Sequence, residues 1–298
     1  MDGLLVTVII PSYNHRDYIA DSILSVLAQT HPAIQLIVID DGSSDGSQDL
    51  IGALAQEHGF TFLAHENRGV CATLNRALAM AEGEYVVTFG SDDIMLPDRV
   101  ERQLAHMVQH PEVGCVGARK HIIDGQGRRT RSASERVQVK SYLFPELLRK
   151  AKAVGAPTAM YRRQAMQEVG GYDERITLED FQMSLHIASL GYRVDILPFA
   201  VTCYRVHDRN YSRSYRRHFR NDLMLLRAFK SHPEYLQGRT EIFNRYLGAA
   251  IRMDLGHART IFGRLPLKQW NRSTWRRYRE YCLAVSRRKL SFWSASAN

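Results

Sequence analysis

Residues 4–14 read LLVTVIIPSYN. Residues 4–10 form a continuous apolar, β-branched run, which is typical of a strand that is buried on both faces, as the strands of parallel sheets are. Pro11 and the polar residues after it end this strand, and a helical pattern of apolar residues follows to about residue 30. The beginning of the chain therefore predicts the first half of a β-α-β unit.

The same alternation continues along the chain. Apolar runs that predict strands alternate with segments that have helical periodicity, and this order is typical of an α/β fold with a largely parallel sheet flanked by helices. A helix, one or two strands and a helical C-terminal region follow. The predicted strands are 4–10, 35–39, 60–64, 84–89, 113–118 and 192–206, and the helices include 97–110, 179–190 and a region from about 214.

The composition limits the class of protein. The chain has 298 residues, is 45% hydrophobic and 24% charged, and has a formal net charge of +9, which excludes a disordered or collagen-like chain. Its four cysteines are widely spaced, which argues against a zinc site or a disulfide scaffold and favours a reducing compartment. Neither a signal peptide nor a membrane-spanning run is recognisable, so we expect a cytoplasmic protein, soluble or peripheral on the inner face of the cell membrane.

The charge is unevenly distributed. Residues 201–298 contain 21 Lys and Arg against 6 Asp and Glu, a net charge of +15, whereas residues 1–200 have a net charge of −6. We therefore expect a catalytic or binding domain over 1–212 and a helical, arginine-rich region over 213–298 that contacts something anionic. An anionic membrane surface, the substrate and a second copy of the chain all remain open as its partner, and nucleic acid is the least favoured.

Polar clusters follow several of the predicted strands. In parallel sheets the carboxyl ends of the strands lie at one edge, where ligands bind, so Ser12–Asn14, Asp40–Ser43, Asn67–Arg68 and Ser91–Asp93 are expected to converge. Paired carboxylates such as Asp92 and Asp93 can hold Mg²⁺ or Mn²⁺. Aspartates are also common in turns and helix caps, so each cluster alone is a weak signal.

Further candidate residues lie later in the chain. Glu179 and Asp180 begin a predicted helix, where a carboxylate can stabilise the helix dipole or act as a general base. His207 can serve as a ligand of a metal or a phosphate, or have a structural role. Near the N-terminus, Tyr13 can stack on a nucleobase, and Arg68 can pair with a phosphate.

Taken together, these clusters form a pattern. Over residues 4–210 the sequence closely resembles the family-two glycosyltransferases with the GT-A fold, a Rossmann-like α/β fold. The resemblance implies an inverting enzyme that transfers a sugar from a nucleotide diphosphate to a hydroxyl group with the help of Mn²⁺ or Mg²⁺. The matching segments are Val6–Asn14, Asp40–Asp45, Asn67–Gly69 with Asn75, Ala81–Tyr85, Ser91–Asp93 and Glu179–Asp180.

The resemblance assigns roles to individual residues. Tyr13 would stack on the base, Asp41 would bond to it, and Pro11 would shape the loop. Asp92 would contact the ribose or the donor sugar, and Asp93 would bind the metal, although the motif here is Ser-Asp-Asp rather than the more common Asp-X-Asp. The remaining implied roles are nucleotide contact for Arg68, catalytic base for Asp180 of the Glu179–Asp180 pair, metal contact for His207, and diphosphate contact for Arg205 and Ser212.

The resemblance also implies substrates. UDP is the favoured nucleotide, and a hexosyl or N-acetylhexosaminyl group is the expected sugar. We expect a glycan acceptor, free or linked to a polyprenyl diphosphate, in cell-surface polysaccharide biosynthesis. A sugar-nucleotide pyrophosphorylase would need a glycine-rich phosphate loop where residues 11–15 read PSYNH. A non-catalytic carbohydrate- or nucleotide-binding protein remains the alternative.

Overall fold

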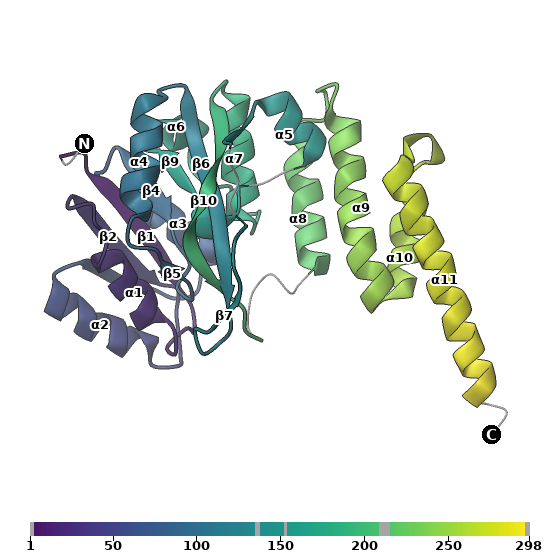
Figure 1. The fold of residues 1–298 in the computed structure, drawn as a ribbon, viewed down its shortest axis with the longest axis horizontal. Coiled ribbons are helices and arrows are strands. Elements are labelled where there is room, and N and C mark those ends of the chain that lie inside the picture. Colours follow the sequence, from purple (N-terminus) through teal and green to yellow (C-terminus); the bar gives the residue numbers. More distant parts are fainter. Residues whose placement is uncertain (1–2, 135–137, 152–153, 209–214, 296–298) are drawn as a thin grey trace. The chain divides into compact units, whose positions relative to one another are not determined.

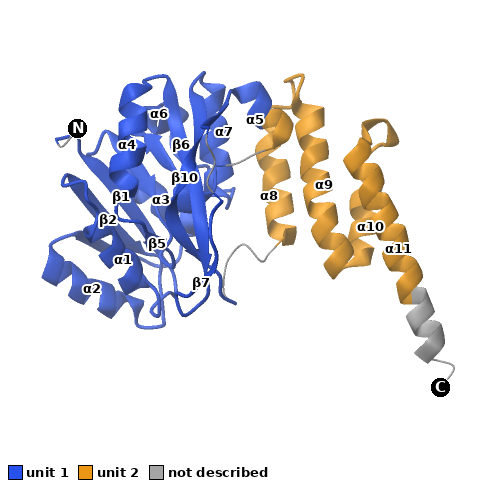
Figure 2. Ribbon diagram, in the orientation of Figure 1, with its two compact units in different colours: residues 1–147, 152–210 blue, residues 148–151, 211–298 orange. Residues whose placement is uncertain are grey.

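The computed structural model describes residues 3–134, 138–151, 154–208 and 215–295, the last seven of these as backbone only. By contact clustering the chain divides into two compact units (Figure 2). The first contains residues 1–147 and 152–210, and the second contains residues 148–151 and 211–298. Each unit is described by itself below.

The first unit is built on one mixed sheet (Figure 1). Among the described residues its strand order is β3-β2-β1-β4-β9-β6-β10-β5, with β7 paired to β6 and β8 paired to β10. The strands are β1 (Val6–Ser12), β2 (Ile34–Asp40), β3 (Thr61–Ala64), β4 (Tyr85–Thr88), β5 (Ile94–Met95), β6 (Val113–Ile123), β7 (Arg129–Arg131), β8 (Lys140–Tyr142), β9 (Met160–Arg162) and β10 (Arg193–Arg205).

The predicted α/β class is confirmed, with a refinement in the second half of the sheet. The first four strands along the chain, β1 to β4, are mutually parallel, as the alternating pattern predicts. β9 lies antiparallel between β4 and β6, and β6 and β10 are again parallel to each other. The short strands β5, β7, β8 and β9 have only two or three residues each, too few for a periodic sequence signal.

Helices flank this sheet. The core contains fully buried side chains of β1, such as Val8 and Ile10, together with Ile23 of α1 and Leu104 of α4. Because side chains alternate along a strand, Ile9 faces the opposite side of the sheet from Val8. The helices of this unit are α1 (Ile19–Leu27), α2 (Ser47–His58), α3 (Val70–Leu78), α4 (Arg99–Gln109), α5 (Phe144–Lys150, whose last residues cluster with the second unit), η1 (Ala156–Thr158), α6 (Arg163–Val169) and α7 (Glu179–Ser189).

The second unit is helical, as predicted for the region from about residue 214. Phe219 of α8 packs edge to face on Phe243 of α9 at a ring distance of 5.2 Å, and both rings are buried. Among the described residues, none of the helices combines the length and the apolar character that crossing a bilayer needs. The helices are α8 (Tyr215–Arg227), α9 (Tyr235–Met253), α10 (Leu255–Gly263), η3 (Leu267–Gln269) and α11 (Arg272–Ala295).

Candidate active site

The loops that follow β1 and β2 are joined by hydrogen bonds between polar side chains and backbone. The backbone N–H of Asn14 donates to Ser43 Oγ at 2.8 Å, and the backbone N–H of Ser44 donates to Asn14 Oδ1 at 2.9 Å. Asn14 has φ = 53°, in the left-handed region that asparagine tolerates better than most residues. The predicted meeting of these two strand ends is therefore present in the structure.

Asp41 connects this edge to the loop before α3. Its carboxylate accepts from the backbone N–H of Arg68 at 2.7 Å and of Gly69 at 3.0 Å, and His65 Nδ1 lies 3.5 Å away. Asp41 is buried, whereas the Arg68 side chain is exposed and Tyr13 is 49% exposed. Asp41 thus fixes the loop that presents Arg68, and the expected contact of Asp41 with a nucleobase stays a prediction.

Pro11 lies at the end of β1, where it pairs in register with Ile39 of β2. It is partly buried and begins the turn that carries Tyr13. Pro11, Tyr13, Asp41 and Arg68 therefore lie at the same edge of the sheet, which is the arrangement expected for a nucleotide site.

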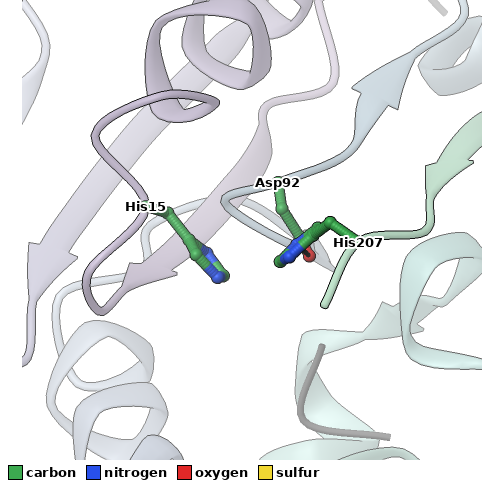
Figure 3. Close-up of side chains that lie close together, drawn as sticks. All are labelled: His15, Asp92 and His207. Atoms are coloured by element: carbon green, nitrogen blue, oxygen red, sulfur yellow. Dashed lines mark hydrogen bonds and ion pairs between the residues drawn. The ribbon is translucent and has the colours of Figure 1, made fainter. Parts of the chain in front are cut away.

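A group of metal-binding side chains lies between the ends of β1, β4 and β10 (Figure 3). His15, Asp92 and His207 each offer one ligand atom, and these atoms lie within 4.8 Å of one another. His207 Nε2 is 3.0 Å from Asp92 Oδ2, and these side chains are 6% and 13% exposed. Two imidazoles and a carboxylate are a donor set that suits a divalent transition metal, so these residues fit a cation.

Asp93 has a different environment from its neighbour Asp92. Its carboxylate is buried and accepts from the backbone N–H of Arg205 at 2.9 Å. Burial, followed by the negative charge of Asp92, raises the pKa of Asp93 well above its usual value. The cluster in Figure 3 contains Asp92, and the metal contact that the resemblance implies for Asp93 stays a prediction.

Arg205 holds the loop that carries these aspartates. Its side chain is 3% exposed. The guanidinium donates to the Asp92 carbonyl at 2.8 Å, to Asp21 Oδ2 at 2.9 Å and to the Gly125 carbonyl at 3.2 Å. This geometry gives Arg205 a positioning role, and its expected contact with a diphosphate stays a prediction. Ser212 lies outside the described residues.

The Glu179–Asp180 pair occupies the first turn of α7, as predicted. The Asp180 carboxylate accepts from the backbone N–H of Ala156 at 3.2 Å and of Phe181 at 2.6 Å. Burial of the carboxyl group, followed by the negative charge of Asp180, raises the pKa of Glu179 to about 8. Glu179 therefore retains its proton near neutral pH.

Two residues at this site were not predicted from the sequence. Lys120 of β6 lies with its ammonium 3.7 Å from the Tyr204 ring centroid. Burial lowers its pKa, and the charges of Asp93 and Asp180 oppose that shift, so Lys120 lies within electrostatic reach of both carboxylates. His15 is the other. Its only sequence signal is its place immediately after Asn14, in a loop at the carboxyl end of a parallel strand.

Comparisons with known proteins identify the family and the fold. A family model described as Glycosyl transferase family 2 matches residues 7–170. TuaG of Bacillus subtilis, named for teichuronic acid biosynthesis, is 42% identical over 107 residues, which cover 35% of this chain and 42% of TuaG. The poly-beta-1,6-N-acetyl-D-glucosamine synthase of Staphylococcus aureus is 27% identical over 205 residues, covering 66% of this chain and 48% of the synthase. The chain thus spans less than half the length of these two relatives.

Solved structures share the fold. TarS of S. aureus in complex with UDP-GlcNAc has a TM-score of 0.67 at 17% identity, covering 89% of this chain and 83% of TarS. The mannosyltransferase PcManGT of Pyrobaculum calidifontis, in complex with GDP-Man and Mn²⁺, has a TM-score of 0.61 at 20% identity, covering 96% and 87%. The fold is GT-A. Because the family model matches more than half of the sequence, the chain belongs to glycosyl transferase family 2.

Proposed function

We propose that this protein is an inverting glycosyltransferase that moves a hexosyl or N-acetylhexosaminyl group from a nucleotide diphosphate to a hydroxyl group during cell-surface polysaccharide biosynthesis. The observation that carries this proposal is that His15, Asp92 and His207, in the loops after β1, β4 and β10, offer ligand atoms within 4.8 Å of one another at the strand-end edge of the sheet. The charges of Asp93 and Asp180 both act on Lys120, which supports a base close to the proposed cation site.

Asp180 is the proposed base. It would take the proton of the acceptor hydroxyl while that oxygen attacks the anomeric carbon from the face opposite the leaving diphosphate, so the configuration inverts. The transition state is oxocarbenium-like, as in glycoside hydrolysis. The raised pKa of Glu179 makes Glu179 the weaker candidate for an ionised base near neutral pH, which supports the choice of Asp180.

Asp92 and His207 would hold the divalent cation. A cation there supplies a positive charge that stabilises the developing charge of the leaving diphosphate. Arg205 holds this loop through the Asp92 carbonyl, and Tyr18 packs on the His207 ring at a centroid distance of 4.7 Å. These contacts fix both ligands before substrate binds, which reduces the ordering that binding requires.

Tyr13, Asp41 and Arg68 would form the nucleotide subsite, with UDP as the favoured nucleotide. The complexes of TarS with UDP and UDP-GlcNAc support this choice. The complex of PcManGT with GDP-Man makes GDP the competing nucleotide. A panel of UDP, dTDP and GDP sugars with Mn²⁺ tests it. We expect one UDP sugar to raise the melting temperature and to be hydrolysed slowly. If none of the nucleotide sugars raises the melting temperature, the proposal is wrong.

An acceptor that carries phosphate groups, such as a glycan on a polyprenyl diphosphate, fits the basic edge next to this site. Arg129 and Arg131 of β7 are exposed. The charge of Arg131 lowers the pKa of Lys120, and the charge of Arg129 lowers the pKa of His121, the next residue of β6. Such an acceptor would place the enzyme at the inner face of the membrane.

The double variant Arg129→Ala/Arg131→Ala tests the acceptor. We expect it to raise KM for a phosphate-bearing acceptor about tenfold and to leave donor affinity unchanged, because each arginine–phosphate contact is a charge-assisted bond. Arg128→Ala is the matched control, since Arg128 pairs with Asp124 in the neighbouring turn. An equal KM for the phosphate-bearing acceptor in the wild type, the double variant and Arg128→Ala would reject the role of Arg129 and Arg131 in acceptor binding.

A further inference from the structure

We propose that His15 is a third protein ligand of the cation, so that the protein binds Mn²⁺ before the nucleotide sugar arrives. This inference rests on the proposed function of the Asp92–His207 pair and adds a residue to that site. His15 comes from the loop after β1, whereas Asp92 follows β4 and His207 follows β10. Figure 3 shows the three side chains converging from these separate segments.

The geometry of the cluster supports coordination. All three ligand atoms lie within 4.8 Å of one another, a spacing that small side-chain shifts can reduce to that of ligands around one ion. The two imidazole rings are nearly perpendicular, with centroids 5.6 Å apart and an interplanar angle of 89°. The rings therefore approach each other edge to face, without stacking.

His15 is also held by neighbouring groups in the way metal-binding histidines are. Its Nδ1 is 2.7 Å from Ser91 Oγ, and Ser91 is itself buried. A hydrogen bond at one ring nitrogen orients the ring of a metal-binding histidine. Tyr18 lies edge-on to His15 at a centroid distance of 6.1 Å and packs on His207, so one aromatic ring contacts both imidazoles.

The donor set predicts which cation binds. Mg²⁺ prefers oxygen ligands and keeps several of its waters, whereas imidazole nitrogens favour transition metals. A site with two imidazoles and one carboxylate should therefore bind Mn²⁺ and Co²⁺ more tightly than Mg²⁺. Three protein ligands should also hold the ion without help from the diphosphate, whereas two would leave binding dependent on the nucleotide.

The test measures metal binding to the full chain in the absence of nucleotide. Calorimetry and the electron paramagnetic resonance of free Mn²⁺ would compare the wild type with His15→Gln and His15→Ala. We expect the wild type to bind one Mn²⁺ and both variants to bind it at least about tenfold more weakly, in line with losses seen when metal sites are altered. His58→Gln, a change at the end of α2, is the matched control, and melting curves without metal confirm folding.

A second measurement uses Co²⁺ as a spectroscopic probe. We expect the visible absorption of bound Co²⁺ to change in His15→Gln, because an imidazole nitrogen is lost from the coordination sphere. Ser91→Ala, which removes only the hydrogen bond that orients His15, should weaken Mn²⁺ binding less than His15→Gln does.

The outcomes separate this inference from the proposed function. Unchanged Mn²⁺ affinity in His15→Gln, or equal affinity of the wild type for Mg²⁺ and Mn²⁺, would overturn the role of His15 even if sugar transfer is intact. Absence of any nucleotide sugar turnover by a wild type that binds Mn²⁺ through His15 would overturn the proposed function and leave the metal site standing.

Discussion

At the scale of single residues, neighbouring carboxyl groups of the same chemical type have different environments. Asp92 faces His207, whereas Asp93 is buried against the backbone N–H of Arg205. Glu179 has a raised pKa because it is buried beside the charge of Asp180. Desolvation penalises the charged form of a carboxyl group, so burial raises the pKa values of Asp93 and Glu179.

Asp180→Asn tests the base. An amide cannot accept the proton of the acceptor hydroxyl, so we expect turnover to fall by about 10²–10⁴-fold, the usual contribution of proton transfer, while the Kd for the nucleotide stays the same. Steady-state rates and calorimetry measure the two quantities. Wild-type turnover would remove Asp180 from the mechanism, and retained binding with no turnover in the wild type itself would favour the alternative of a non-catalytic binding protein.

Asp92→Asn and Asp93→Asn distinguish the two candidate ligands of the Ser91–Asp93 loop. We expect Asp92→Asn to remove the effect of Mn²⁺ on nucleotide affinity, because it replaces the carboxylate that faces His207. Asp93→Asn keeps an oxygen that can accept from Arg205, so Mn²⁺ should still strengthen nucleotide binding. Calorimetry with and without Mn²⁺ is the measurement. Loss of the Mn²⁺ effect in Asp93→Asn but not in Asp92→Asn would assign the metal to Asp93.

At the scale of elements, strand ends and helix starts deliver the side chains of the site. β10 brings Arg205 and His207 to the Ser91–Asp93 loop, and the first turn of α7 presents Glu179 and Asp180. A carboxylate is stabilised at a helix N-terminus by the helix dipole. In α7 two adjacent carboxyl groups occupy this position, and burial of Glu179, followed by the negative charge of Asp180, raises the pKa of Glu179.

Glu179→Gln tests that protonation through stability. A carboxyl group whose pKa is higher in the folded protein than in the unfolded chain stabilises the fold at low pH, and this contribution is lost as the pH rises through the folded pKa. Wild-type stability should therefore fall between about pH 4.5 and pH 8. The variant should lack this decline and be more stable at pH 8 by at least about 1 kcal/mol, the equivalent of one pKa unit.

Urea unfolding of both proteins at pH 5 and pH 8 gives the measurement. At pH 5 the carboxyl group of Glu179 is neutral in the folded protein, as is the amide that replaces it. The comparison of the two proteins at pH 5 is therefore the internal control for any packing effect of the amide. A stability difference that is the same at the two pH values would show that Glu179 titrates normally.

At the scale of the whole molecule, we propose that exposed aromatic and basic side chains of the helical unit bind an anionic bilayer. Leu267, Trp275 and Tyr278 are 70%, 53% and 39% exposed. Trp270, Trp275 and Tyr278 are in mutual contact, with ring centroids 4.7–6.2 Å apart. Aromatic residues beside cations are typical of helices that lie in a membrane interface. The exposed arginines of α11 near these rings are Arg272, Arg276 and Arg279.

Vesicle binding tests this surface. We expect the protein to sediment with vesicles of phosphatidylcholine and phosphatidylglycerol, to bind pure phosphatidylcholine weakly, and to be released by salt, since surface charges are screened. Trp275→Ala and Arg276→Ala/Arg279→Ala should each reduce binding, whereas Arg220→Ala on α8 is the control for loss of charge. No binding at low salt would exclude a membrane, and dimerisation through the same residues would assign the surface to a second copy.

The sequence by itself determined the α/β class, the parallel first half of the sheet and the positions of its polar loops. These features are encoded locally, because a buried strand needs a continuous apolar run and a strand end needs residues that form turns. The helix that carries Glu179 and Asp180 was predicted for the same reason. The short antiparallel strands were not, because two or three residues contain too little pattern and their pairing depends on distant partners.

Only the tertiary structure decided which side chains meet. His15, Asp92 and His207 are far apart in the sequence and come together because parallel strands deliver their carboxyl ends to one edge. Asp92 and Asp93 are equivalent as sequence, and their difference arises from burial and from the position of Arg205. Lys120 lies beyond the predicted strand 113–118 and has no signal in the sequence, whereas in the folded protein the charges of Asp93 and Asp180 act on it. Electrostatic environment is a property of three-dimensional neighbours, so no local pattern can encode it.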